Sequence, residues 1–160
     1  MGAEAEDNTI SAALDRAMAA GAEVRGTTSP NPPVGAVIVS AAGEVAGVGA
    51  TQPVGGAHAE VMALRAAGEK ARGGTAVVTL EPCAHTGRTG PCTQALIDAG
   101  VACVYYLHSD PTSQAAGGAR ALAEAGVDVI KLEKPPQVED ALMPWLWAMR
   151  TRRPHTVSYT

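Results

Sequence analysis

The chain has 160 residues, of which 46% are hydrophobic, so it is long enough and apolar enough for one globular domain with its own core. Its net charge of −4 and isoelectric point near 5.5 argue against a nucleic-acid partner, because proteins that bind a nucleic-acid backbone usually carry a basic surface. No run of about 18 apolar residues is present and the N-terminus is acidic, so we expect a cytoplasmic protein without a membrane contact.

The beginning of the chain predicts a helix, a stiff loop and a hairpin. Apolar residues at helical spacing predict the helix over 7–24, with Asp7 or Asn8 as its N-cap. The loop that follows contains three prolines, which exclude a helix and hold Asn31 in a stiff turn. The two strands of the hairpin are expected at 34–40 and 43–50.

From there on, helical and strand patterns alternate. Helices are expected at 58–70, 91–100, 118–126 and 135–150. Strands are expected at 75–80, 101–107 and 127–132. The alternation predicts an α/β fold with right-handed crossovers and a largely parallel sheet between helices. The last helical segment contains Pro144, which we expect to interrupt it.

Two of the three cysteines lie close together in the segment LEPCAHTGRTGPC, where each directly follows a proline. Cys83 and Cys92 could form a disulfide, pack as buried thiols, or ligate a metal. An odd number of cysteines argues against a disulfide framework. Upstream, His58 and Glu60 flank Ala59 where a glycine-rich loop enters a predicted helix. Both segments are expected at the edge of the sheet where α/β proteins bind ligands, so their side chains can meet.

One imidazole and two thiolates are a donor set that suits Zn²⁺, and three protein ligands leave a fourth position for water. Each cysteine is expected at a helix start, where the helix dipole favours the thiolate. Glu60 is then the natural proton carrier. Residues two apart do not share a helix face, so convergence of Glu60 with His58 requires His58 to precede the first helical turn. Cys103 lies inside a predicted strand and is expected to be a small buried hydrophobic residue.

The order of His-x-Glu, Pro-Cys and a second Cys is typical of zinc nucleobase deaminases. The spacing departs from that pattern, because eight residues separate Cys83 from Cys92 where two are usual. Taken singly, each Pro-Cys pair is more typical of an ordinary turn over a buried thiol than of a metal ligand. Taken together and in this order, the elements favour a metal site.

This longer insertion resembles that of the diaminohydroxyphosphoribosylaminopyrimidine deaminases of riboflavin biosynthesis, within the cytidine-deaminase-like superfamily. The matching segments cover nearly the whole chain: TSPNPPVGAVIV, GGAHAEVMALRAAG, TLEPCAHTGRTGPC, the Asp110-Pro111 pair and RTRRPHTVSYT. The resemblance implies a three-layer α/β/α sandwich with a mixed sheet of about five strands. It also implies zinc ligands at His58, Cys83 and Cys92, with Glu60 as proton shuttle. The implied reaction is hydrolytic removal of the exocyclic amine at C2 of 2,5-diamino-6-(5-phosphoribosylamino)pyrimidin-4-one, with release of ammonia.

The resemblance implies further that Asn31, His85, Arg88 and Asp110 line the substrate pocket, with Arg88 reaching towards the phosphoribosyl end. An Arg side chain offers phosphate a charge-assisted fork, and an Asn in a stiff turn can pair with a ring edge. The structural alternatives are an Asn and an Asp that cap their own turns, a surface Arg, and a His that donates to the backbone.

Two positions in the implied sugar-phosphate region depart from many relatives: Thr51 replaces a histidine and Thr112 replaces an asparagine. Threonine keeps a hydroxyl but loses reach, so a different pyrimidine substrate is an open alternative. That alternative is a stand-alone deaminase of a related pyrimidine or purine base in a specialised pathway. A tRNA-editing deaminase fits the acidic chain poorly, and a non-catalytic zinc scaffold leaves Glu60 without a role.

The resemblance also bears on domain organisation. Residues 1–150 are expected to form the deaminase domain, and 151–160 resemble the start of a reductase domain that relatives usually carry. The chain is then a stand-alone deaminase with a separate reductase partner, or a fragment of a longer enzyme. A homo-oligomer is expected from the superfamily. The apolar stretch ALMPWLWAM is either a partner surface or a helix face that covers the sheet.

Overall fold

The computed structural model describes residues 2–83, 92–109, 117–133 and 141–151. It contains five strands, which are β1 (Gly35–Val39), β2 (Val45–Ala50), β3 (Thr75–Leu80), β4 (Cys103–His108) and β5 (Asp128–Lys131). Its α-helices are α1 (Gly2–Glu23), α2 (Ala59–Ala67), α3 (Cys92–Asp98), α4 (Gly118–Glu124) and α5 (Met143–Thr151). A short 3₁₀ helix, η1 (Gly68–Ala71), extends α2. The predicted order of elements is therefore confirmed.

The strands form one mixed sheet in the order β2-β1-β3-β4-β5. Strand β1 pairs antiparallel with both β2 and β3, whereas β3, β4 and β5 are parallel to one another. The mixed sheet of five strands implied by the resemblance is confirmed, and so is the antiparallel hairpin of β1 and β2. The largely parallel sheet expected from the alternation of helices and strands was wrong for the pairing of β1 with β3. The reason is that α2 connects β2 to β3, which run in the same direction, while β1, the antiparallel hairpin partner of β2, lies between them and is therefore antiparallel to both.

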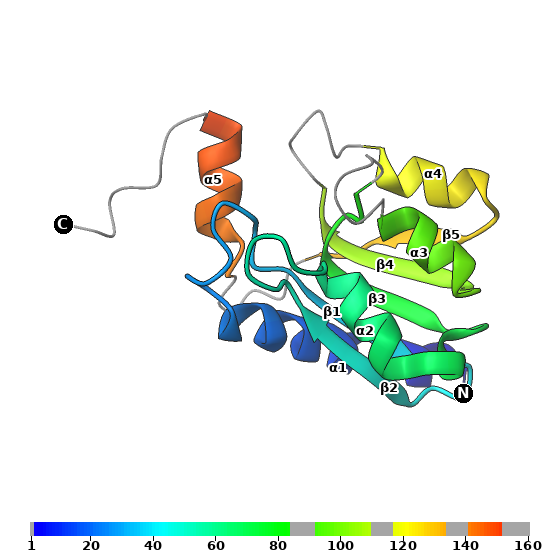
Figure 1. Ribbon diagram of the computed structural model, residues 1–160. Coiled ribbons are helices and arrows are strands. Elements are labelled where there is room, and N and C mark those ends of the chain that lie inside the picture. Colours follow the sequence, from blue (N-terminus) through cyan, green and yellow to red (C-terminus); the bar gives the residue numbers. More distant parts are fainter. Residues whose placement is uncertain (1, 84–91, 110–116, 134–140, 152–160) are drawn as a thin grey trace.

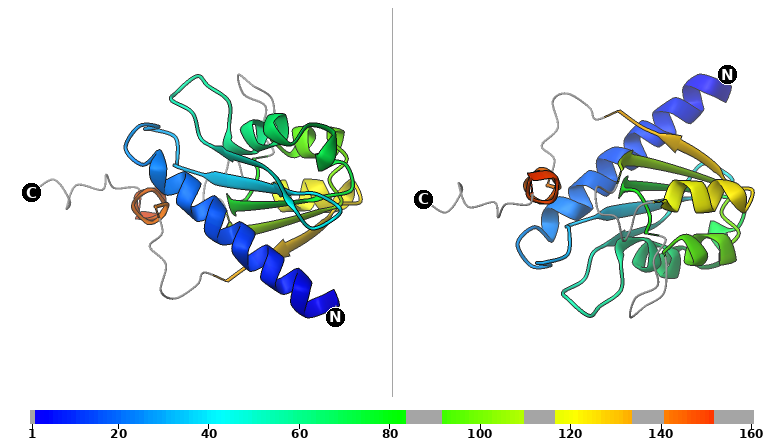
Figure 2. Two further views of the ribbon diagram at one scale, coloured as in Figure 1. Left: turned by 90° about the horizontal axis from the view of Figure 1, so that it is seen from below. Right: turned by 90° about the horizontal axis from the view of Figure 1, so that it is seen from above.

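Helices cover both faces of the sheet. Figure 1 and Figure 2 show α1 lying alone across one face, with α2, α3 and α4 on the opposite face. Every residue of β1 is buried, as expected for a strand covered on both sides. Val37 and Val39 pack in the cluster beneath α1, whereas Ala36 and Ile38 pack in the cluster beneath the other helices. The three-layer α/β/α sandwich is confirmed.

Small residues let α2 lie directly on β2. A Cβ atom added to Gly49 would collide with the backbone of Ala59 and Ala63, and one added to Gly47 would collide with the backbone of Ala63 and Ala67. The glycines therefore set the distance between the strand and the helix. This close approach positions the beginning of α2, where two of the predicted site residues lie.

Two predictions about helix ends were wrong. Helix α1 begins at Gly2, so Asp7 and Asn8 lie within the helix and neither is its N-cap. Pro144 is the second residue of α5 and does not interrupt it. A proline is accommodated in the first turn because its missing N–H has no intrahelical partner there.

Helix α5 stands at the end of the sheet where β1 begins (Figure 1). Leu142, which precedes it, and Leu146 are almost completely buried in the core, whereas the side chain of Trp147 is 41% exposed. The apolar C-terminal stretch therefore covers part of the core and also presents an apolar side to solvent. Within the described ranges, no helix is both long enough and apolar enough to cross a lipid bilayer.

Candidate active site

The predicted site residues meet at one edge of the sheet. Gly35, the first residue of β1, pairs with Ala50, the last residue of β2. Because β3 is antiparallel to β1, its end at Leu80 reaches the same edge, where it pairs with His108 at the end of β4. The loops that follow β2, β3 and β4 therefore leave the sheet together, as ligand-binding loops do in α/β proteins.

His58 and Glu60 lie on either side of the first residue of α2. His58 is the N-cap of this helix and has an extended backbone, with φ −74° and ψ 164°, while its carbonyl accepts the N–H of Met62 at 3.1 Å. Glu60 lies in the first turn and is only 5% exposed. The requirement that His58 precede the helical turn is met, so both side chains can point to one place.

The sulfur atoms of Cys83 and Cys92 both lie close to the imidazole of His58. The Nδ1 atom of His58 lies 3.0 Å from the Sγ atom of Cys92 and 3.8 Å from that of Cys83. Cys92 is the first residue of α3, as predicted, whereas Cys83 is the last described residue of the segment after β3, and the helix start predicted there falls on residues outside the described ones. The N–H of Thr93 in α3 donates to the carbonyl of Cys83 at 3.3 Å, which holds the two cysteines together.

The three side chains fit a zinc ion. Their donor atoms all lie within 4.8 Å of one another. In a tetrahedral zinc site with these donors, ligand atoms are about 3.5–3.8 Å apart. All three cysteines of the chain are free thiols, so the disulfide alternative does not apply. Buried thiols alone would not require an imidazole nitrogen between them, whereas this donor set suits zinc.

The protonation of the cluster follows from its geometry. A hydrogen bond from the thiol of Cys92 lowers the pKa of Cys83 to about 4, with further help from His58. A hydrogen bond with Cys83 raises the pKa of His58, and the same sulfur raises that of Cys92. Burial raises the pKa of Glu60 to about 7. Cys83 is therefore favoured as a thiolate, which favours a bound cation. The neighbouring carboxyl group of Glu60 can exchange a proton near neutral pH.

A second buried carboxylate supports the segment that carries Cys83, and the sequence analysis missed it. Glu81 is 8% exposed, and its Oε2 atom accepts the N–H of Ala119 in α4 at 2.9 Å. A Cβ atom at Gly118 would collide with the carbonyl of Pro82, so α4 is packed directly on this segment. The signal in the sequence was the charged residue that closes an apolar strand, immediately before the Pro-Cys pair.

Two of the predicted substrate residues lie at the same edge of the sheet. Asn31 is half-buried in the proline-rich loop that precedes β1. Thr51 directly follows β2 and is 4% exposed, with its hydroxyl hydrogen-bonded to the backbone of Pro32 and Val34. Their contact with a substrate stays a prediction. The other four predicted substrate residues lie outside the described residues, namely His85, Arg88, Asp110 and Thr112. Cys103 is half-buried, whereas full burial was expected.

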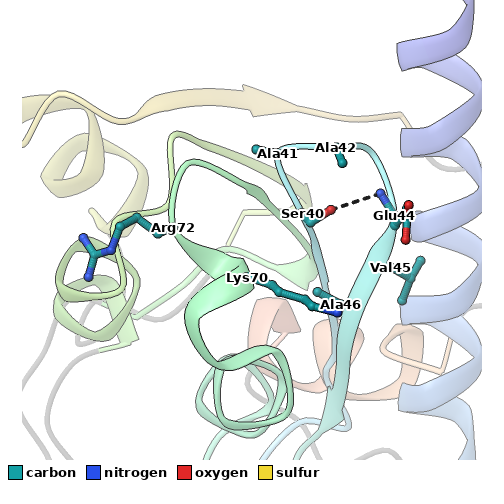
Figure 3. A pocket seen from close by; sticks show the side chains of 8 residues that line it. All are labelled: Ser40, Ala41, Ala42, Glu44, Val45, Ala46, Lys70 and Arg72. Atoms are coloured by element: carbon teal, nitrogen blue, oxygen red, sulfur yellow. Dashed lines mark hydrogen bonds between the residues drawn. The ribbon is translucent and has the colours of Figure 1, made fainter.

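A surface hollow of about 340 Å³ lies at the opposite edge of the sheet, next to the turn between β1 and β2. It is lined by Ser40, Ala41, Ala42, Glu44, Val45, Ala46, Lys70 and Arg72. Figure 3 shows that the guanidinium group of Arg72 points away from this turn, where the N–H of Glu44 donates to Ser40. None of the zinc-site residues lines this hollow, so we do not assign the active site to it.

Comparison with known proteins gives one family. Residues 7–108 match the family described as the cytidine and deoxycytidylate deaminase zinc-binding region. The chain is 64% identical over 146 residues to riboflavin biosynthesis protein RibD of Corynebacterium ammoniagenes, covering 91% of this chain and 43% of that protein. It is 50% identical over 143 residues to RibD of Escherichia coli K12, covering 89% and 39%. The chain therefore spans less than half the length of these relatives.

Solved structures give the same result. A diaminohydroxyphosphoribosylaminopyrimidine deaminase/5-amino-6-(5-phosphoribosylamino)uracil reductase from Thermotoga maritima is similar with a TM-score of 0.84 and 33% identity, covering 92% of this chain and 43% of that one. RibD of Acinetobacter baumannii gives a TM-score of 0.80 and 41% identity, covering 90% and 41%. A dCMP deaminase from cyanophage S-TIM5, at 23% identity and a TM-score of 0.55, shares the fold.

Proposed function

Because the chain belongs to the cytidine and deoxycytidylate deaminase zinc-binding family, we propose that it acts in riboflavin biosynthesis. The proposed reaction removes the exocyclic amine at C2 of 2,5-diamino-6-(5-phosphoribosylamino)pyrimidin-4-one by hydrolysis and releases ammonia. The observation that carries this proposal is the cluster of His58, Cys83 and Cys92 beside buried Glu60. The substrate rests on the 64% identity to a RibD protein over 91% of this chain.

In this proposal, His58 Nδ1 and the two cysteine sulfurs hold the zinc ion. When bound, zinc supplies a Lewis acid that makes water a nucleophile near neutral pH. The Glu60 carboxylate would take one proton from the attacking water and transfer it to the ring nitrogen next to C2. It would then carry the second proton of that water to the amine, which leaves as ammonia as the C–N bond breaks and the C2 carbonyl forms. Its pKa of about 7, raised by burial, suits both directions of this transfer.

The proposed substrate contacts come from the family resemblance and are supported by residue chemistry. The carboxamide of Asn31 can pair with the edge of the pyrimidine ring, because it offers both a donor and an acceptor. His85, Arg88 and Asp110 complete the proposed pocket, with Arg88 as the partner of the phosphate. Thr112 is assigned to the sugar-phosphate end, whereas the hydroxyl of Thr51 is bonded to the backbone of Pro32 and Val34 and is not assigned a direct contact with the substrate.

We propose that residues 1–150 form the deaminase domain and that the segment 151–160 leads towards a reductase. The Thermotoga maritima relative, whose title names a reductase as well as a deaminase, supports this proposal. The reductase would be a further part of the protein or a separate partner. A homo-oligomer is proposed from the apolar side of α5, with Met143 and Trp147 each 41% exposed. The free thiols of the zinc site fit a reducing cytoplasm.

The test is ammonia release by the zinc-loaded protein offered the phosphoribosylated diaminopyrimidinone, cytidine, cytosine and guanine in parallel. We expect turnover of the phosphoribosylated compound alone. Glu60→Gln should lower kcat by about 10²–10⁴-fold with unchanged zinc content, because it removes the proton carrier without removing a ligand. Glu44→Gln, at an exposed position on the opposite edge of the sheet, is the matched control.

Three other outcomes would change this assignment. Turnover of cytidine, cytosine or guanine in place of the phosphoribosylated compound would assign the chain to a related base. Full activity of Glu60→Gln would contradict the assignment of Glu60 as the proton carrier. If the wild type binds zinc but releases ammonia from none of the four compounds, the proposed function is wrong.

A further inference from the structure

Three buried threonines surround the proline-rich segment 28–35, which we term the Asn31 turn. They come from different parts of the chain: Thr28 from the turn itself, Thr51 from the end of β2, and Thr79 from β3. Each is between 1% and 4% exposed. The hydroxyl of every one of them is hydrogen-bonded to the backbone of this turn.

Thr51 makes two of these hydrogen bonds. Its Oγ1 atom donates to the carbonyl of Pro32 at 2.9 Å and accepts the N–H of Val34 at 2.9 Å. The N–H of Thr51 also donates to the carbonyl of Val34 at 3.0 Å. A hydroxyl has one hydrogen to donate, so that of Thr51 has none left for another acceptor. Its near-complete burial also separates it from solvent.

The other two threonines hold the ends of the turn. The hydroxyl of Thr28 donates to the carbonyl of Asn31 at 2.8 Å, and the N–H of Asn31 donates to the carbonyl of Thr28 at 2.8 Å. At the far end, the hydroxyl of Thr79 accepts the N–H of Gly35 at 3.1 Å. The backbone of Asn31 is therefore held on both its N–H and its carbonyl.

Side-chain hydroxyls hold this turn because the regular hydrogen bonds of a strand cannot form along it. Pro30, Pro32 and Pro33 have no N–H, so regular strand pairing cannot continue from β1 into the turn. The hydroxyl of Thr51 adds a second donor to the carbonyl of Pro32, which also accepts the N–H of Val34 at 3.0 Å. Thr51 also begins the loop that leads to His58, so it connects the Asn31 turn to the zinc site.

The network leaves the side-chain amide of Asn31 out of its hydrogen bonds. Asn31 is half-buried, and within the described part of the chain no hydrogen-bond partner is found for its side-chain amide. A carboxamide on a fixed backbone loses little conformational freedom when it binds a ligand. Because the turn and the zinc ligands occupy the same edge of the sheet, this amide is presented on the side of the molecule where the pyrimidine would bind.

We propose that Thr28, Thr51 and Thr79 are positioning residues that hold the carboxamide of Asn31 ready for the pyrimidine ring. Thr51 acts through the backbone of Pro32 and Val34 and does not touch the substrate. This inference rests on the proposed function, because it assigns the ligand of Asn31 to the pyrimidine.

The first test is the kinetics of Thr51→Val, which removes the hydroxyl but keeps the branched shape. We expect KM for the phosphoribosylated diaminopyrimidinone to rise by about tenfold, since that corresponds to the loss of one buried hydrogen bond. The zinc content and kcat should stay near those of the wild type, because the lost interaction serves binding and not the chemical step. Thr51→Ser keeps the hydroxyl and should restore KM.

A double-mutant cycle separates positioning from direct contact. If Thr51 acts through Asn31, then Thr51→Val should raise KM in the wild type but have little further effect in an Asn31→Ala background. Thr79→Val should raise KM in the same direction, whereas Thr75→Val, at the opposite end of β3, is the matched control. Additive effects of Thr51→Val and Asn31→Ala, or an unchanged KM in Thr51→Val, would overturn the proposal.

Hydrogen exchange gives a readout that does not depend on the substrate. The amide of Gly35 should exchange faster in Thr79→Val, because it loses the Thr79 hydroxyl as acceptor. The amide of Val34 should exchange faster in Thr51→Val, because it loses one of its two acceptors and keeps only the carbonyl of Pro32. Unchanged exchange in both variants would show that the threonines do not hold the turn. If the wild type fails to deaminate the pyrimidine while exchange responds as expected, the proposed function is wrong but the anchoring of the turn stands.

Discussion

At the scale of single residues, the site depends on how burial and neighbours divide charge among four side chains. Cys83 is favoured as a thiolate because it receives a hydrogen bond from Cys92 and lies beside the imidazole of His58. Glu60 experiences the opposite effect, because burial is the largest influence on its pKa and disfavours the carboxylate. The cluster thus provides an anionic sulfur for a metal and a carboxyl group that can be protonated near neutral pH.

We predict that Cys83→Ser abolishes stable zinc binding, because a serine hydroxyl is a harder and far less acidic ligand than a thiol. Zinc affinity should fall by more than the roughly 10–100-fold that accompanies loss of an outer-shell partner. Metal analysis after dialysis against a weak chelator measures this. Cys103→Ser is the matched control, since Cys103 is outside the cluster and should leave the zinc content unchanged. Equal zinc retention by both variants would contradict the assignment of Cys83 as a ligand.

At the scale of elements, the site depends on how closely α2 lies on β2. Gly49 faces the first turns of the helix, next to the backbone of Ala59 and Ala63. Gly47 faces the same helix about one turn further on, next to Ala63 and Ala67. Because His58 caps the beginning of α2, a displacement there directly changes the position of a proposed zinc ligand.

We predict that Gly49→Ala and Gly47→Ala each lower the free energy of unfolding by about 1–3 kcal/mol, because each forces a methyl group against helix backbone. Denaturant unfolding of the two variants measures this cost. Only Gly49→Ala should also weaken zinc retention, because its methyl group lies against the residue next to His58. Equal zinc retention by the two variants would show that the position of α2 does not control the site.

At the scale of the whole molecule, α5 completes the core at the edge that carries the site. Leu146 is fully buried in the same hydrophobic cluster as Ala59 of α2 and Leu96 of α3. One residue further along, Trp147 is 41% exposed. The C-terminal helix thus joins the core on one side and leaves an apolar surface on the other.

We predict that Leu146→Ala lowers the free energy of unfolding by about 2–5 kcal/mol, because it leaves a cavity in the core. Trp147→Ala should cost clearly less, since much of its side chain already contacts solvent. Thermal or denaturant unfolding of both variants at matched concentration measures the difference. A larger loss for Trp147→Ala would indicate that this side chain is covered in solution, as it would be in an oligomer.

The sequence by itself predicted the His58, Cys83 and Cys92 group that the fold brings together, and it determined the order of the elements. Both depend on short segments of the sequence. His58 and Glu60 are two positions apart at a helix start, and each strand or helix shows a short periodic pattern of apolar residues. The proposed reaction came from the family resemblance and not from these patterns. Helix ends were less accurate, as α1 and Pro144 show, because capping depends on contacts as well as residue type.

Only the tertiary structure decided how distant parts of the chain support the site. The hydrogen bond between Thr51 and Val34 joins residues 17 positions apart, and that between Thr79 and Gly35 joins residues 44 positions apart. The contact between Glu81 and Ala119 spans 38 positions. A threonine hydroxyl that faces solvent and one that holds a buried turn look the same in the sequence. The difference arises only when folding removes water and leaves each buried polar group to find its partner in the chain.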